Sequence, residues 1–272
     1  MLLRNVKILG FATFIEGGRH RALWAIVVLS VLLTLSNIVF TTMFSWDLGK
    51  VAIEFGLSAI SFSGLLLIFF LGLKIMADDL ERGRIYMILS RPVSISEYMV
   101  GKFLGLALIL LFATAILGIS AAISMSFILV EYPGFVPPGF SWQIYLMALT
   151  CQWLGLLVIL AICFFWFSCS SHSFVALIFS ACSYLLGQNM ETLRYVIEKN
   201  PQAGFLAGQE WLVRLVSWIF PNLSLFDKKT VAAYGLAFTW SEFSLIIVYG
   251  LSYIGLLLFF SVLLYKRKEL AA

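Results

Sequence analysis

The chain has 272 residues, of which 62% are hydrophobic and 12% are charged, whereas a water-soluble domain has roughly 25% charged residues. This composition excludes an ordinary soluble domain, and unbroken apolar stretches favour helices over a β-barrel, whose strands alternate polar and apolar residues. We therefore expect an all-α integral membrane protein. The net charge of +4 comes from basic flanks of the apolar stretches, so no nucleic-acid partner is predicted.

Six apolar stretches each reach the roughly 20 residues that a bilayer demands. They are predicted at Ala22–Phe44, Phe55–Leu73, Phe103–Val130, Ile144–Phe167, Ser168–Gly187 and Phe243–Tyr265. The first is too long for a signal-peptide core and lacks a small-residue cleavage site, so we expect a retained anchor. Only the residues from Ser168 to Ser173 separate the fourth and fifth apolar runs, so one bent segment is the alternative there.

Basic residues predict the orientation, because Lys and Arg tend to remain cytoplasmic. One side holds 12 of the 18 basic residues, namely Arg4, Lys7, Arg19, Arg21, Lys74, Arg82, Arg84, Arg91, Lys102, Lys266, Arg267 and Lys268. The other side holds 6, namely Lys50, Arg194, Lys199, Arg214, Lys228 and Lys229. The larger set is predicted to be inside, which places both termini in the cytoplasm.

Residues 1–21 are predicted to form an N-terminal interfacial segment, with Arg4 and Lys7 among apolar residues and Gly17 and Gly18 as its break. The alternative is a basic flank that only sets the orientation.

Residues 74–102 are predicted to form a cytoplasmic elbow. Asp78 and Arg82 lie one helical turn apart with the acid first, which favours a short helix that Pro92 must terminate. A second helix begins at once, because Ser94 and Glu97 have the spacing of a capping box. Two helices joined at a proline form a rigid protrusion that can transmit force to a partner.

The fifth apolar stretch carries a stripe of small residues at steps of three and four. Its members are Cys169, Ser173, Ala176, Ser180, Ser183 and Gly187. In lipid, helices associate where small side chains let backbones approach. Packing within the chain is favoured slightly over a homodimer seam. Gly101 and Gly105 form a GxxxG pair at the start of the third stretch, a pattern too common to argue from.

Residues 188–242 are the only large non-spanning region and are too apolar to be disordered. Within it, Glu210, Arg214 and Ser217 share one helical face, opposite a face of tryptophan, leucine and isoleucine. This pattern predicts a helix in the outer interface that ends at Pro221. Two roles are open, an amphipathic lid and a part in substrate release.

The apolar stretches contain no Asp, Glu, Lys or Arg, whereas ion-driven pumps usually place such residues at mid-membrane. An external energy source is therefore favoured. No GxSxG, HExxH or GxxxxGK[ST] pattern is present, so no catalytic role and no ATP site of this type is predicted. Cys169 and His172 share a helical face, but two ligands without a third favour a structural role over a metal site.

Asp79–Ser94 reads DLERGRIYMILSRPVS and is followed by Glu97-Tyr98 and Gly101-Lys102-Phe103. It resembles the cytoplasmic signature of ABC-2-type export permeases, and especially the NosY-like permeases associated with multicopper-enzyme maturation. Residues 217–227, SWIFPNLSLFD, resemble a Pro-Asn-Leu…Phe-Asp element that such permeases carry before the last span. Arg84 and Tyr86 depart from the pattern, so ATPase contacts of these two positions are not carried over.

The resemblance implies a single domain over residues 1–272 with the ABC-2 (type V exporter-like) fold, six transmembrane helices and a cytoplasmic coupling helix. It implies a homodimeric or heterodimeric membrane unit bound to a separate ATPase subunit, which would hold ATP and Mg. The second and fifth spans would line the central path, and this chain would need no cofactor. The implied coupling residues are Asp79, Glu81, Arg82, Gly83, Ser90, Arg91 and Pro92. The predicted path or dimer-seam residues are Ser58, Ser61, Ser173, Ala176, Ser180, Ser183 and Gly187.

The sequence thus predicts the permease subunit of an ATP-driven exporter in a bacterial cytoplasmic membrane, surrounded by membrane lipid. Apolar spans dotted with serines predict an amphipathic or lipid-like cargo over a small ion. The alternative is a membrane component of an assembly machine that acts on periplasmic or lipoprotein partners without moving a substrate. An intramembrane enzyme is a third class, but the sequence offers no catalytic pair for it.

Overall fold

The computed structural model describes residues 2–19, 48–81, 93–131, 139–170, 172–192 and 219–270, with isolated positions at 24–25, 27–28, 31–32, 35–36, 39, 134, 137 and 195. Across these residues the chain is helical and contains no strand. Four of the described helices are long and apolar enough to cross a membrane: Gly49–Asp78, Ile95–Phe127, Trp142–Cys169 and Trp240–Arg267. The fold is that of a multi-pass helical membrane protein.

These four helices contain the second, fourth and sixth apolar stretches predicted from the sequence and all but the last three residues of the third. The first stretch falls mostly outside the described residues. The fifth corresponds to α8 (Ser173–Gln188), an apolar helix of 16 residues, which is shorter than the four long helices. Helix α7 (Trp142–Cys169) ends at Ser170, whose backbone is extended. The chain then folds back, since Trp166 of α7 donates a hydrogen bond to Ser183 of α8 at 2.8 Å. Two antiparallel helices therefore replace the alternative of one bent segment.

The second predicted span is one continuous helical rod with a change of winding at its centre. It begins with α3 (Leu48–Leu66), passes through a π-helix, η1 (Leu67–Gly72), and continues as α4 (Leu73–Glu81). The Leu73 amide donates to the Ile68 carbonyl, five residues back. Single π turns shift the side chains that follow around the helix axis and often occur at functional sites. The helix expected after the second span is thus an extension of that span as far as Glu81.

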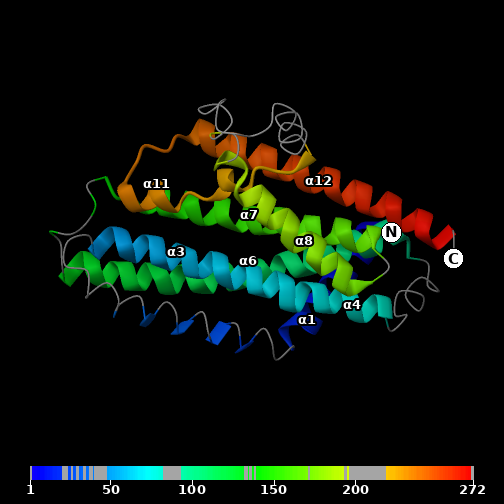
Figure 1. Ribbon diagram of the computed structural model, residues 1–272. Coiled ribbons are helices and arrows are strands. Elements are labelled where there is room, and N and C mark those ends of the chain that lie inside the picture. Colours follow the sequence, from blue (N-terminus) through cyan, green and yellow to red (C-terminus); the bar gives the residue numbers. More distant parts are fainter. Residues whose placement is uncertain are drawn as a thin grey trace.

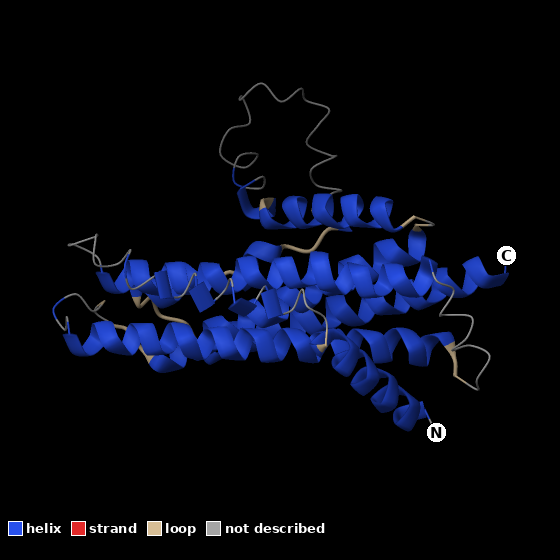
Figure 2. Ribbon diagram, turned by 90° about the horizontal axis from the view of Figure 1, so that it is seen from below, coloured by secondary structure: helices blue, strands red, loops and turns tan. Residues whose placement is uncertain are grey.

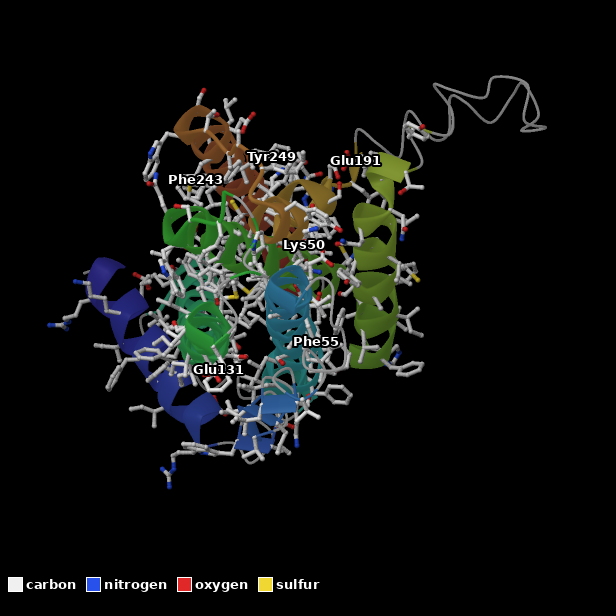
Figure 3. All side chains as sticks on the ribbon, turned by 90° about the vertical axis from the view of Figure 1, so that its left-hand side faces the viewer. Lys50, Phe55, Glu131, Glu191, Phe243 and Tyr249 are labelled. Atoms are coloured by element: carbon white, nitrogen blue, oxygen red, sulfur yellow. The ribbon has the colours of Figure 1, made fainter. Side chains whose placement is uncertain are left out.

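The longest described helix, α6 (Ile95–Glu131), has 37 residues and runs beside the α3–η1–α4 rod (Figure 1). Helices α7 and α12 (Trp240–Leu270) form the opposite layer. The short helix α1 (Leu2–Gly18) slants away from the bundle at one end in Figure 2. In the end view of Figure 3, α1 and α8 lie on opposite sides of the bundle.

The main core lies where η1, α6 and α7 meet. Its fully buried members include Ile68, Leu71, Leu160 and Phe164, and Phe103 of α6 packs edge-on against Phe164. Outward-facing residues are also apolar, as with Ile123 at 66% and Leu245 at 66% exposure. A helix bundle whose side chains are apolar on both its inner and its outer surfaces is suited to lipid.

The described helices alternate in direction, so their ends form two groups. The end of α4, the start of α6 and the ends of α7 and α12 meet at a small cavity lined by Met76, Tyr98, Lys102, Phe167 and Tyr265 among others. We call this the elbow end, because the predicted elbow connects α4 to α6 there. The start of α1 and the end of α12 both lie at this end (Figures 1 and 2).

Candidate functional site

A short segment between α8 and α12 packs among the helices partway along the bundle and leads towards the end opposite the elbow. It comprises Pro221 and Asn222, the 3-10 helix η3 (Leu223–Phe226) and Asp227, and it leads into α11 (Lys229–Tyr234). The Asn222 side chain begins η3 by accepting a hydrogen bond from the Ser224 amide at 3.2 Å. The Asn222 amide in turn donates to the Tyr249 hydroxyl of α12 at 3.0 Å. We call residues 221–227 the re-entrant segment.

Three glycines on three helices make room for the re-entrant segment. A methyl group at Gly155 of α7 would lie 2.8 Å from Phe226 Cβ, and one at Gly250 of α12 would lie 3.0 Å from Phe226 Cε1. A methyl group at Gly187 of α8 would lie 2.8 Å from the Pro221 carbonyl oxygen. Real Cβ atoms essentially never approach to 2.8 Å and rarely approach to 3.0 Å, so a larger residue at any of these positions would crowd the segment.

The re-entrant segment lies deep along the helices that hold it. Gly250 follows Trp240 by ten residues, which is about 15 Å along a helix. Trp240 contacts Phe243, and Trp142 contacts Tyr145, so aromatic clusters mark the start of both α12 and α7. Such aromatic residues concentrate at the membrane surface, and half of a hydrocarbon core is about 15 Å. Phe226 therefore sits near the middle of the bundle.

A cavity of about 70 Å³ borders the re-entrant segment. Its apolar wall is formed by Leu65, Leu156, Ile159, Leu223 and Phe226, together with Gly155. Its polar wall is formed by Ser61, Gln152, Tyr184, Gln188, Asp227 and Lys229. Backbone outside a regular helix is tolerated at membrane depth where it is buried in protein or lines a polar cavity, and this segment meets that requirement.

Gln152 supplies the buried amide of the polar wall and is only 8% exposed. Its Nε2 atom donates to the Leu57 carbonyl at 2.7 Å and lies 2.5 Å from the Ser61 hydroxyl. These two contacts join α7 to α3 and fix the amide toward the cavity.

Asp227 and Lys229 bring an acid and a base to the same cavity. Lys229 Nζ lies 3.1 Å from Asp227 Oδ2, and the Lys229 amide donates to Asp227 Oδ1 at 3.3 Å. Their side chains are 30% and 23% exposed. Charged groups thus reach the bundle interior from a non-spanning segment, although the apolar stretches themselves carry none. The absence of charge from the apolar stretches did not predict this pair.

The predicted path residues divide between two places. Ser61 borders the cavity, whereas Ser58 is exposed on α3. Ala176, Ser180, Ser183 and Gly187 are buried, and Ser183 and Gly187 face α7 and the re-entrant segment within the same chain. Ser173 is partly buried at the start of α8. The small-residue stripe therefore packs inside this chain along most of its length.

At the elbow end, α1 packs against the start of α6 through glycines. A methyl group at Gly105 would lie 2.6 Å from the Gly10 carbonyl oxygen, and one at Gly101 would lie 2.7 Å from Leu9 Cβ. Lys102 Nζ is 3.3 Å from Glu16 Oε2 across the same contact. The GxxxG pair of Gly101 and Gly105 thus lies at the contact that holds α1 on α6. We call this contact the α1–α6 seam.

The capping box predicted at the start of α6 is present. The Glu97 amide donates to the Ser94 hydroxyl at 3.3 Å, and the Ser94 amide donates to Glu97 Oε2 at 2.9 Å. Asn5 of α1 also donates to Glu97 Oε2, at 3.3 Å. The same carboxylate therefore begins α6 and joins it to α1.

Most predicted coupling residues lie outside the described part of the chain. These are Arg82, Gly83, Ser90, Arg91 and Pro92. Asp79 and Glu81 belong to the last turn of α4, and their side chains are likewise not described. The amphipathic helix predicted over Glu210, Arg214 and Ser217 also falls outside the described residues.

Among the described residues, no group of three or more His, Cys, Asp or Glu side chains could hold a metal ion. Cys169 and His172 are both exposed, and His172 precedes α8 without a side-chain cap.

No protein-family model matches the chain, and no curated protein matches it either. The fold and the site define a class, an all-helical multi-pass membrane protein with a polar cavity inside the bundle.

Proposed function

We propose that the chain is the permease subunit of an ATP-driven ABC exporter of the ABC-2 type, with six spans and both termini in the cytoplasm of a bacterium. The observation that carries the proposal is the elbow sequence from Asp79 to Ser94, placed between the second and third spans and followed by a formed capping box. The sequence has no GxxxxGK[ST] loop, so ATP would be bound with Mg by a separate ATPase subunit.

The helices on either side of the elbow support this proposal. Helix α4 leads into the elbow and α6 leads out of it, and Met76 of α4 and Met99 of α6 line a small cavity at the elbow end together with Phe164 of α7 and Tyr265 of α12. Helix α1 is attached to the same part of α6 at the α1–α6 seam. Closure of the ATPase pair would press on the elbow and tilt the second and third spans together.

The π-helix η1 supports a moving second span. A π turn has a wider winding than the α-helix on either side, and such turns occur frequently at functional sites. Here it lies in the main core opposite Leu106 and Leu160, between the elbow and the cavity. Motion of α4 would reach Ser61 and Gln152 through this turn.

The test replaces Glu81 and Gly83, two of the coupling residues that the family resemblance implies. Glu81→Ala with Gly83→Ala is expected to reduce co-purification of the ATPase subunit and to reduce ATP-driven transport. The matched control is Glu131→Ala with Gly134→Ala, which makes the same two changes where α6 ends, opposite the elbow. A methyl group at Gly134 would have no atom within 4 Å. Unchanged co-purification and transport in the elbow variant would refute the coupling site.

A further inference from the structure

The cavity beside the re-entrant segment has the composition of a small-molecule site. A binding site is typically concave and mostly apolar, with a few polar groups that converge on one point. Here apolar residues line the cavity together with amides, hydroxyls, an acid and a base from α3, α7, α8, the re-entrant segment and α11. The function proposed above assigns no ligand to these groups.

The charges of the cavity determine which ligand it accepts. Asp227 and Lys229 are the charged residues of its lining, and they neutralise each other at 3.1 Å. A simple cation would pair with Asp227 but leave Lys229 without its counter-charge at membrane depth, and a simple anion would do the reverse. Leaving one partner of such a pair uncompensated is costly. The ligand must therefore be neutral overall.

A neutral ligand that carries one positive and one negative group can replace the single Asp227–Lys229 ion pair with two ion pairs, one to each residue. Its ammonium group would replace Lys229 at the Asp227 carboxylate, and its anionic group would replace Asp227 at the Lys229 ammonium. Both side chains retain some exposure, 30% and 23%, so each can be reached. The amides of Gln152 and Gln188 and the hydroxyl of Tyr184 complete the polar wall.

The size and position of the cavity restrict the ligand further. A volume of about 70 Å³ holds several waters or one small polar group, but not an acyl chain. Apolar residues make up part of the lining, and the outward faces of the surrounding helices are apolar, as with Leu185 of α8 at 58% exposure. This arrangement suits a polar head whose remaining part stays in lipid.

We propose that this cavity binds a small zwitterionic group, an ammonium joined to a phosphate by a short linker, with Asp227 holding the ammonium and Lys229 the phosphate. Such a group is present in zwitterionic phospholipid headgroups and in the free headgroup compound. Identifying this ligand with the exported cargo rests on the function proposed above, whereas the binding itself requires only this chain.

The experiment measures binding to the purified full-length chain in detergent micelles, without an ATPase subunit, by isothermal titration calorimetry. The probes are glycerophosphoethanolamine, a neutral phosphodiester, as the free group, dihexanoyl phosphatidylethanolamine as the lipid-borne group, and dihexanoyl phosphatidylglycerol as the anionic comparison. We expect at least one zwitterionic probe to bind at least tenfold more tightly than the anionic lipid. Binding of both zwitterionic probes assigns recognition to the headgroup alone, and binding of the lipid alone assigns it to the membrane-borne form.

Variants locate the site. Asp227→Asn and Lys229→Gln should each weaken binding of the zwitterionic probe at least tenfold, whereas Lys229→Arg, which keeps the charge, should keep binding within threefold. The matched controls are Glu131→Gln and Lys228→Gln, which remove the same charges outside the cavity lining; they should stay within twofold. Circular dichroism and gel-filtration profiles identical to the parent chain show that each variant is folded.

The proposal fails if neither zwitterionic probe binds, if the anionic lipid binds as tightly, or if the cavity variants behave like their controls. Any of these results leaves the elbow test untouched, because that test depends on the ATPase subunit and not on this cavity. Conversely, loss of ATPase co-purification in the elbow variant has no bearing on binding measured with the chain alone.

Discussion

Replacing Gly105 by alanine tests the α1–α6 seam. The new methyl group would lie 2.6 Å from the Gly10 carbonyl oxygen and 2.6 Å from Thr13 Cβ, whereas ordinary contacts begin at 3.4 Å. The difference, 3.4 − 2.6 = 0.8 Å, is the separation that α1 and α6 must gain. The neighbours cannot yield by rotating, since one is backbone and the other is the branched Cβ of a side chain that is 2% exposed.

The same displacement would disturb the polar contacts on either side of the seam. Lys102 to Glu16 and Asn5 to Glu97 both span 3.3 Å, and an added 0.8 Å takes them beyond hydrogen-bonding range. Overpacking of this kind costs about 1–3 kcal/mol. Alanine also gains about 0.5–1 kcal/mol over glycine inside a helix, so a control must remove that contribution.

The control is Gly255→Ala in α12, where a methyl group would have no atom within 4 Å. Both changes place alanine in a helix, so their difference isolates the seam. We expect Gly105→Ala to unfold about 1–3 kcal/mol more easily than Gly255→Ala in reversible denaturation of the chain in mixed micelles, followed by circular dichroism. Equal free energies of unfolding for the two variants would refute the close approach of α1 to α6.

Three further substitutions test the contacts described above by the same unfolding assay. Ser94→Ala should cost about 1 kcal/mol, since it removes the hydroxyl that begins α6. Gln152→Leu should cost about 0.6–1.7 kcal/mol, the range for polar contacts between membrane helices, because the amide joins α7 to α3. Trp166→Phe should cost about 0.5–1.5 kcal/mol, since it removes the hydrogen bond to Ser183 but keeps a ring beside Phe179.

Each of these three has a comparison variant that keeps the contact in whole or in part. Ser94→Thr keeps a capping hydroxyl, and Gln152→Asn keeps an amide but shortens it, so it should fall between the parent chain and Gln152→Leu. Phe165→Leu removes an aromatic ring next to Trp166 but keeps the hydrogen bond that Trp166 donates to Ser183. A Ser94→Ala or Gln152→Leu variant as stable as the parent would show that the contact contributes nothing.

Apolar length and local capping were predictable from the sequence because both depend on neighbouring residues. The second, third, fourth and sixth stretches each lie within a helix long enough to span. Ser94 and Glu97 form the capping box that their spacing predicts. Helix α1 ends at Gly18, at the glycine pair expected to break it.

Long-range packing could not be read from the same patterns. The charge-free spans suggested an interior without ionisable groups, but Asp227 and Lys229 reach the cavity because Gly155, Gly187 and Gly250 leave space for the re-entrant segment. Nothing in the local sequence indicates that three glycines so far apart in the chain contact the same segment. The resemblance over residues 217–227 marked this segment as distinctive without indicating its depth.

For the GxxxG pair, the pattern could be seen in the sequence but its packing partner could not. Gly101 and Gly105 were visible in the sequence, but such pairs are frequent in apolar helices. Their partner is the glycine of a helix 91 to 95 residues earlier (101 − 10 and 105 − 10), which periodicity within one helix cannot identify. The π turn at Leu67–Gly72 was equally invisible, because its residues have the same apolar character as the α-helix around them.

In the proposed complex the elbow faces the cytoplasm and docks on an ATPase subunit. The most direct measurement uses Ser90→Cys in a chain whose four cysteines, Cys151, Cys163, Cys169 and Cys182, are replaced by alanine. In intact cells, a membrane-impermeant maleimide should leave this cysteine unmodified, and in inverted vesicles a short bifunctional cross-linker should join it to the ATPase subunit. Modification from outside intact cells, or no cross-link to an ATPase in inverted vesicles, would contradict the account.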